Sequence, residues 1–379
     1  MFLPYTMCKE VDAHPFRQVE KMMRSIWGWG LPVLIAGVCL GCGDGASPSR
    51  VARIQGGGAT FIQPIMEEWA YAYQQARGVE IDYQAKGSGN GIQQMTARTL
   101  DFGCSDAPMK RSQWEEALTK GGEVIHIPLV LGAVVPVYNL PGIEKPLIFD
   151  GPTLADIYLG KVTRWNDPAL QSLNPGVTLP DLPISPVYRA EASGTTNIFT
   201  EFLAKASPEF KAQIGASTQP TWPKGIGTGE RENAGVVGRI KNSPGTIGYA
   251  EIRFAKVNQV AYGAVKNRAG KVVQANPEAI TAAALHAMNT RQTEEPYSLH
   301  DLTFSLTDAA GEDAYPISGV TYALIYKKQK AAMGRALRDF FLWCVHEGQE
   351  FAIRLDYAPL PEALVKKIEA RLEQIELEP

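Results

Sequence analysis

The stretch RAEASGTTNIF, residues 189–199, combines side chains that can bind an anion. It places the guanidinium of Arg189 and the carboxylate of Glu191 just before three small residues, Ser193-Gly194-Thr195. The apolar residues that follow have helical spacing, so we expect a helix to begin at Ser193. A helix start leaves backbone N–H groups unpaired, and a guanidinium suits a tetrahedral oxyanion. The stretch therefore predicts an anion site.

Two other stretches share this order of glycine, a hydroxyl residue and a helical apolar pattern. GGGATF places Thr60 at a predicted helix start with Phe61 behind it, and AKGSGNG places Ser88 at another. Because Ser and Thr cap helices in many proteins, ordinary capping explains each stretch taken alone. Three such starts in one chain, together with Arg189, favour their convergence on one anion.

The segment DFGCSDAPM, residues 101–109, offers a carboxylate that has two possible roles. Asp106 could be the N-cap of a helix with Pro108 in its first turn. Alternatively, its carboxylate could face the bound anion, where it can only accept a hydrogen bond. An anion that carries a proton, as phosphate does near neutral pH, would then be preferred over sulfate, which carries none.

The composition indicates an ordinary globular protein. The chain has 379 residues, of which 45% are hydrophobic and 20% charged, and this length favours two lobes or domains. The formal net charge is −3, and the basic residues are scattered, so we do not expect nucleic acid as a partner. The five histidines are isolated in the sequence and have no metal-ligand spacing, so we expect neither a metal site nor a cofactor.

The N-terminal segment has the order of an export signal. Basic residues precede the apolar run IWGWGLPVLIAGVCLGC, and a polar stretch follows it. We predict a signal or lipoprotein leader over residues 1–42 and a linker over 43–52. The ending Leu40-Gly41-Cys42 resembles a bacterial lipoprotein signal, which implies that Cys42 is the lipidated residue. Ordinary cleavage and an uncleaved anchor are the alternatives. Cys104 and Cys344 lie beyond the leader, and we expect two buried thiols rather than a disulfide.

Strand-like and helix-like segments alternate after the linker, which predicts an α/β protein. Strands are expected at 79–86, 124–139, 246–254 and 320–328, and helices at 61–76 and 332–348. The strands near 130 and 320 bracket a middle block. They would suit two lobes joined by crossing strands, with the ligand between them.

Several motifs, in this order, closely resemble the phosphate-binding proteins of the bacterial phosphate-specific ABC transporter. They are GGGATF, YQAKGSGNG, DFGCSDAP, DIYLGKVTRWNDP, LNPGVTLP, RAEASGTTNIF, PGTIGYAE and GEDAYPISGVTYALIYK. The resemblance runs from about residue 54 to about residue 372. It implies a periplasmic-binding-protein type II fold with two α/β lobes and a hinge of crossing strands. We accordingly expect lobe I at 53–133 and 319–379, and lobe II at 134–318.

The resemblance also implies how the protein works. It implies that inorganic phosphate is bound outside the cytoplasmic membrane and delivered to the permease and ATPase of an ABC importer. It further implies a monomer in the periplasm or cell envelope, attached to the membrane only through an N-terminal lipid or anchor. By matching motif, the phosphate ligands would be Thr60, Phe61 through its backbone N–H, Ser88, Asp106, Arg189, Ser193, Gly194 and Thr195.

One position departs from the family pattern. Glu191 stands where an aspartate usually pairs with the arginine and steadies it, and the following residue is Ala192 rather than glycine. One extra methylene could shift Arg189 and alter the affinity.

Three other functions stay open. The chain could bind another oxyanion such as sulfate, molybdate or tungstate, it could act as a phosphate sensor or scavenger, or it could be an exported phosphatase. We expect no enzyme, because phosphoester hydrolysis usually needs a metal cluster or an activated nucleophile.

Overall fold

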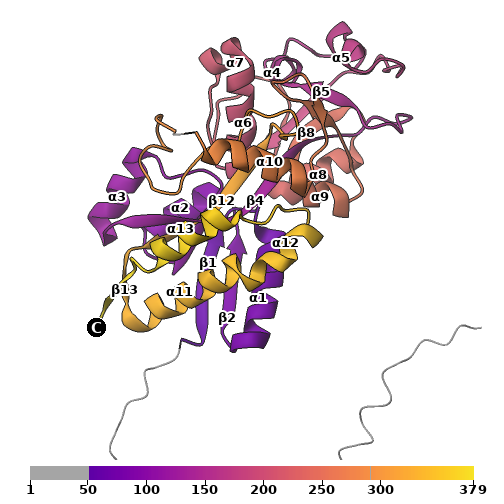
Figure 1. Ribbon diagram of the computed structural model, residues 1–379. Coiled ribbons are helices and arrows are strands. Elements are labelled where there is room, and N and C mark those ends of the chain that lie inside the picture. The colour runs from indigo at the N-terminus through magenta and orange to yellow at the C-terminus, as the bar shows by residue number, and fades with distance from the viewer. Residues whose placement is uncertain (1–50, 291) are drawn as a thin grey trace, which may run out of the picture. The chain divides into compact units, whose positions relative to one another are not determined.

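The structure is a computed structural model that describes residues 51–290 and 292–379 (Figure 1). The predicted leader, the lipidation of Cys42 and nearly all of the predicted linker lie outside these residues. The described residues belong to one compact unit. Within them, no helix combines the length and the apolarity that crossing a bilayer requires.

Strands and helices alternate along most of the chain, so the predicted α/β class is confirmed. The strands are β1 (Arg53–Gly58), β2 (Glu80–Ala85), β3 (Phe102–Ser105), β4 (Val124–Tyr138), β5 (Ile148–Asp150), β6 (Ser185–Arg189), β7 (Thr228–Glu230), β8 (Thr246–Glu251), β9 (Ala261–Tyr262), β10 (Ala264–Lys266), β11 (Val272–Val273), β12 (Ser318–Tyr326), β13 (Lys328–Lys330) and β14 (Glu376–Glu378). The helices are α1 (Gln63–Arg77), α2 (Ser88–Thr96), α3 (Arg111–Gly121), α4 (Gly151–Tyr158), α5 (Pro168–Leu173), α6 (Gly194–Ala206), α7 (Pro208–Gln213), α8 (Glu232–Asn242), α9 (Ile252–Val257), α10 (Pro277–Met288), α11 (Ala331–Val345), α12 (Glu350–Arg354) and α13 (Glu362–Leu372), with a short 3₁₀ turn at Glu347–Gln349.

The main sheet begins with parallel strands from the N-terminal third of the chain. Its order is β2-β1-β3-β12-β4-β8-β6-β7, and β9 pairs with β4 off this path. β1 pairs in parallel with both β2 and β3, so the carboxyl ends of β1 and β3 lie at one edge of the sheet. α1 packs against β2, and its apolar stripe of Ile65, Met66, Trp69 and Tyr73 is buried. Residues after β1 and β3 are thereby held close together.

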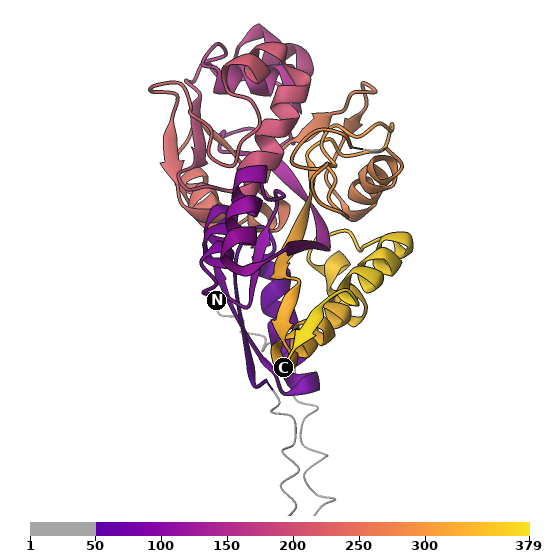
Figure 2. The same cartoon turned by 90° about the vertical axis from the view of Figure 1, so that its left-hand side faces the viewer.

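The C-terminal helices lie on the same part of the molecule as the N-terminal strands. α11 contacts α1 and β1, and α12 contacts α1 (Figure 2). The indole N–H of Trp69 in α1 donates to the carbonyl of Gly348 at 2.7 Å, which ties the two ends of the described chain together. Helices from the C-terminal end of the chain thus pack beside elements from its N-terminal end.

β4 belongs to both halves of the main sheet. All 15 of its residues are buried. Val124–Ala133 pairs antiparallel with β12, whereas Val134–Tyr138 pairs antiparallel with β8. The predicted lobe boundary at 133/134 falls where β4 changes its partner. The lobe boundaries themselves stay a prediction.

Most segments expected from the sequence are present. The predicted strand at 246–254 is too long, because α9 begins at Ile252, where Glu251 caps it by accepting from the Arg253 N–H at 3.0 Å. Cys104 and Cys344 are both free and buried, as expected. Burial raises the pKa of both thiols, which keeps them protonated and unreactive.

Candidate anion-binding site

Arg189 is the last residue of β6, and its guanidinium is fully buried. Glu191 pairs with it through Oε1, which accepts from both Nε, at 2.9 Å, and Nη2. The same oxygen accepts from the Glu232 N–H at 3.0 Å. The predicted pairing of Glu191 with Arg189 is therefore present in the structure. A buried guanidinium held on one side by a carboxylate directs its remaining donors to the other side.

α6 begins immediately beyond this pair, and its start has the predicted form. Ser193 is the N-cap, and its hydroxyl accepts from the Thr196 N–H at 3.2 Å. Gly194 and Thr195 are the first residues of the helix, so no intrahelical carbonyl pairs with their N–H groups. Thr195 Oγ1 lies 3.4 Å from Arg189 Nη1. A positive helix end and a guanidinium therefore adjoin.

Asp106 follows β3 and is 3% exposed. Its Oδ1 accepts from the Thr321 hydroxyl at 2.6 Å, and its Oδ2 accepts from the Ser88 hydroxyl at 3.3 Å. The alternative role as a helix N-cap is wrong, because α3 begins only at Arg111. Asp106 is thus a buried acceptor held by two neutral hydroxyls.

The pKa of Asp106 is raised to about 7, chiefly because burial disfavours the charged carboxylate. The hydrogen bonds from Thr321 and Ser88 and the positive charge of Arg189 oppose this shift. The carboxyl group is therefore able to exchange a proton near neutral pH.

Thr60 and Phe61 lie in the turn between β1 and α1. The prediction that Thr60 caps this helix is wrong: α1 begins at Gln63 with Ile62 in the cap position. The Thr60 hydroxyl instead accepts from Asn233 Nδ2 at 2.9 Å. The Phe61 carbonyl accepts from the Tyr357 hydroxyl at 2.6 Å. The turn is thus held by side-chain contacts rather than by a cap.

Ser88 is the first residue of α2 rather than its cap, because Gly87 occupies the cap position. The Ser88 hydroxyl accepts from the Asp106 N–H at 3.1 Å as well as donating to its carboxylate. The start of α2 is thereby attached to the end of β3.

The starts of α2 and α6 lie in contact. A Cβ atom at Gly194 would lie 2.5 Å from Asp106 Oδ2 and would also clash with the Ser88 hydroxyl. The Gly89 N–H donates to the Ala192 carbonyl at 3.0 Å. Glycine at position 194 is what permits this approach.

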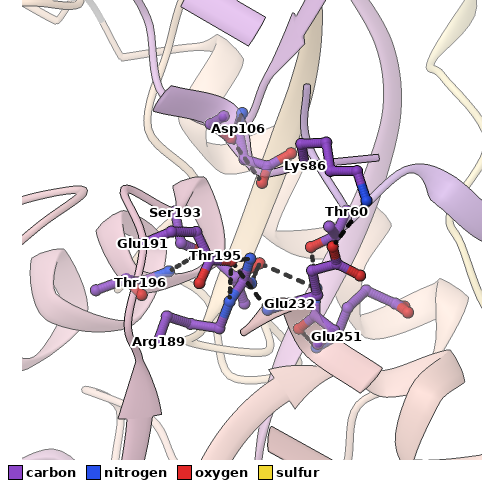
Figure 3. Close-up of polar contacts among 12 residues, drawn as sticks. Thr60, Lys86, Asp106, Arg189, Glu191, Ser193, Thr195, Thr196, Glu232 and Glu251 are labelled. Carbon is purple, nitrogen blue, oxygen red and sulfur yellow. Dashed lines mark hydrogen bonds and ion pairs between the residues drawn. The ribbon is translucent and has the colours of Figure 1, made fainter. Parts of the chain in front are cut away.

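The structure therefore brings the predicted ligand residues together from distant segments of the chain (Figure 3). Thr60, Asp106, Arg189 and Thr195 all lie in the neighbourhood that the figure shows. Two residues of this neighbourhood were missed by the sequence analysis, Thr321 and Asn233. Thr321 lies inside a quoted family motif, which was the available signal, whereas nothing in the sequence around Asn233 marks it.

The site is rich in donors, and the buried carboxyl group of Asp106 lies among them. In the part of the chain that the structure describes, no group of three or more His, Cys, Asp or Glu side chains could hold a metal ion. His126 is buried away from the cluster, where its ring stacks on His300 at a centroid distance of 4.1 Å. Burial lowers the pKa of both imidazoles, which favours the neutral rings.

The comparisons with known proteins agree with this geometry. The model of the PBP superfamily domain matches residues 45–346. The chain is 42% identical over 327 residues to the phosphate-binding protein PstS of Xylella fastidiosa (strain Temecula1), with 86% of each chain covered. It is 38% identical to PstS of Pasteurella multocida (strain Pm70), covering 86% of this chain and 91% of the relative.

Solved structures share the fold. A high-affinity periplasmic phosphate-binding protein (PfluDING) bound with phosphate aligns with a TM-score of 0.67 and 19% identity, covering 86% of this chain and 99% of that one. A phosphate-binding protein from Stenotrophomonas maltophilia aligns with a TM-score of 0.65 and 19% identity, covering 84% and 93% of the two chains. The expected periplasmic-binding-protein type II fold is thereby confirmed.

Proposed function

We propose that this chain, which belongs to the PBP superfamily and within it to the phosphate-binding proteins, binds inorganic phosphate between α6 and the ends of β1 and β3. The observation that carries the proposal is the buried carboxyl group of Asp106, which lies among converging donors. A donor cluster suits any oxyanion, whereas a carboxylate within it suits an anion that brings a proton.

Each predicted ligand has a part that its position supports. Arg189 and the N–H groups of Gly194 and Thr195 supply positive charge at the start of α6. The hydroxyls of Ser193 and Thr195 add donors, as do Thr60 and the Phe61 N–H. The Ser88 hydroxyl has one proton and can donate to phosphate only in place of its 3.3 Å bond to Asp106. Asp106 accepts the phosphate proton. Glu191 steadies Arg189 even though the family usually has aspartate there, because its Oε1 reaches Nε and Nη2 together.

Binding of a different oxyanion is the main alternative. Sulfate has no proton to give to an ionised Asp106, so the two negative groups would face each other in a buried site without compensation. An exported phosphatase is less well supported: the relatives are named as binding proteins, and the donor cluster contains no histidine beside Ser193.

Transport is the use that the relatives suggest. We propose that the protein works outside the cytoplasmic membrane as a monomer and delivers phosphate to the permease and ATPase of an ABC importer. Lipidation at Cys42 would keep it at the membrane surface. Closure of the predicted lobes, with β4 and β12 as the crossing strands, would enclose phosphate and hold it until it reaches the permease.

Calorimetric titration of the full-length chain, stripped of bound anion, tests the proposal. Phosphate should bind tightly with one-to-one stoichiometry, and sulfate should bind much more weakly at pH 8, where Asp106 is mostly ionised. Absence of phosphate binding would refute the proposed ligand and leave only the fold. Equal binding of phosphate and sulfate would retain an anion site but refute the part given to Asp106.

A further inference from the structure

Asn233 links two of the hydroxyls in the site. It is the second residue of α8 and is fully buried. Its Nδ2 lies 2.9 Å from Thr60 Oγ1 and 3.3 Å from Thr195 Oγ1. Thr60 follows β1 and Thr195 begins α6, so one amide joins segments that the chain places far apart.

The orientation of this amide is decided by its other contact. The Glu251 N–H lies 3.1 Å from Asn233 Oδ1. A backbone N–H can only donate, so the atom that faces it must be the carbonyl oxygen of the side chain. The NH₂ group of Asn233 must then face the two threonines, and its two protons serve one hydroxyl each.

This orientation determines the direction of the threonine protons. A hydroxyl has one proton and two lone pairs, so a hydroxyl that accepts from Asn233 keeps its own proton for another partner. Thr195 Oγ1 is also close to the donor Arg189 Nη1. Both threonine hydroxyls are therefore presented as donors, and phosphate oxygens without protons accept only.

The backbone around Asn233 is adapted to hold it there. Glu232, immediately before it, has φ of 61°, in the left-handed region that non-glycine residues rarely occupy. The Glu232 N–H donates to Glu191, the partner of Arg189, and the Glu232 carboxylate lies 3.5 Å from Lys86 Nζ. The start of α8 is thus connected both to the partner of Arg189 and to Lys86, which follows β2 (Figure 3).

We propose that Asn233 is a positioning residue that orients the Thr60 and Thr195 hydroxyls as proton donors to the anion. The inference rests on the proposed phosphate site. Asn233 acts through the threonines, so its contribution should depend on their hydroxyl groups and not only on the stability of the fold.

A double-mutant cycle tests this dependence. Phosphate affinity is measured by calorimetry on full-length, stripped protein for Asn233→Ala, alone and combined with Thr60→Val or with Thr195→Val. We expect Asn233→Ala alone to weaken phosphate binding roughly 10- to 100-fold, because two donors to a charged group lose their orientation. In either valine background the additional loss should be smaller, by about threefold or more.

Asn174→Ala is a matched control. Asn174 is also buried, its Oδ1 accepts from the Ile148 N–H at 2.8 Å, and its Nδ2 donates to the carbonyls of Ile148 and Leu170. Its partners are backbone groups, and none of them is a hydroxyl. This variant should lower the melting temperature and leave phosphate affinity unchanged.

Asn233→Asp provides a second variant if Asn233→Ala does not fold. It keeps the size of the side chain and the acceptor for the Glu251 N–H. Its second carboxylate oxygen, however, would accept the protons of the Thr60 and Thr195 hydroxyls, which could then no longer donate to the anion. Its penalty should also shrink in the valine backgrounds. The inference is overturned by equal penalties in all backgrounds, by unchanged affinity, or by a matching loss in Asn174→Ala. If the wild-type protein fails to bind phosphate, the proposed function is refuted as well.

Discussion

The two buried charges of the site are compensated in different ways. Arg189 has an ionic partner, Glu191, which accepts from two of its nitrogens. Asp106 is held by the neutral hydroxyls of Thr321 and Ser88. We call the first the donor side, made of Arg189, Glu191 and the start of α6, and the second the acceptor side, made of Asp106, Thr321 and Ser88.

Because of this difference, we expect the donor side to set the affinity for oxyanions and the acceptor side to set the selectivity between them. The donor side offers N–H groups and positive charge that any tetrahedral oxyanion can use. The acceptor side offers a carboxyl group whose pKa is raised to about 7, so its protonation responds to pH and to the ligand. Changes on the donor side should therefore affect all anions alike, whereas changes on the acceptor side should affect one anion relative to another.

The largest effect is expected from Arg189→Met. Removing one member of a buried charge pair typically costs about 2–5 kcal/mol, or roughly 30- to 5,000-fold in affinity. The remaining carboxylate of Glu191 would also repel the ligand. Calorimetry should show this loss for phosphate, whereas Arg164→Met, which removes the exposed partner of Asp181, should bind normally. Phosphate affinity within threefold of wild type would contradict a donor side that supplies the affinity.

Asp106→Asn should change the choice of anion. The amide can donate to sulfate, so the preference for phosphate over sulfate should fall by about 10- to 100-fold, the value of one or two hydrogen bonds to a charged group. Competition titrations with both anions measure it. The control is Asp101→Asn, a carboxylate that accepts from the Gln55 N–H at 2.7 Å. Unchanged selectivity in Asp106→Asn would refute the part given to the acceptor side.

Sulfate binding to the wild-type protein should depend on pH. Sulfate needs a protonated Asp106, and the protonated fraction of an acid rises as the pH falls through its pKa. With a pKa of about 7, sulfate affinity should rise about tenfold between pH 8 and pH 6. Asp106→Asn should remove this dependence. Sulfate affinity that does not change with pH in the wild-type protein, or that rises with pH, would contradict the predicted fall of affinity with rising pH.

The smallest effect is expected from Glu191→Asp. The shorter side chain should still pair with Arg189 but lose the Glu232 N–H, a contact of 3.0 Å, and one hydrogen bond is worth about 2- to 12-fold in affinity. Phosphate and sulfate should weaken together. Glu209→Asp, in an exposed pair with Lys161, serves as the control. A change in selectivity rather than affinity would show that the two sides are not separable.

Local patterns predicted the donor side better than the acceptor side. The N-cap at Ser193 could be recognised because capping depends only on neighbouring residues. Asp106 has the same local pattern as a cap, but burial and Thr321, which lies far along the chain, give it another role. Thr60 was misplaced because a turn separates it from α1.

Nothing local could have revealed Asn233. Its partners are Thr60, Thr195 and Glu251, each on a different element, and their proximity is a product of the tertiary fold. The family motifs indicated which residues meet, because they summarise a fold, but they did not indicate which residues support them. The strands, by contrast, were predictable from the apolar runs themselves, as the wholly buried β4 illustrates.

The place of β12 in the main sheet has a consequence for how the chain folds. It lies between β3 and β4, which are neighbours in sequence, and it pairs with both. The sheet therefore cannot be completed until residues 318–326 have been synthesised and have returned to the N-terminal strands. Such long-range pairing slows folding, because the chain loses the entropy of closing the intervening loop before the contacts between the strands can stabilise it. In an emerging chain the N-terminal strands would thus lack this central partner until most of the chain has been synthesised.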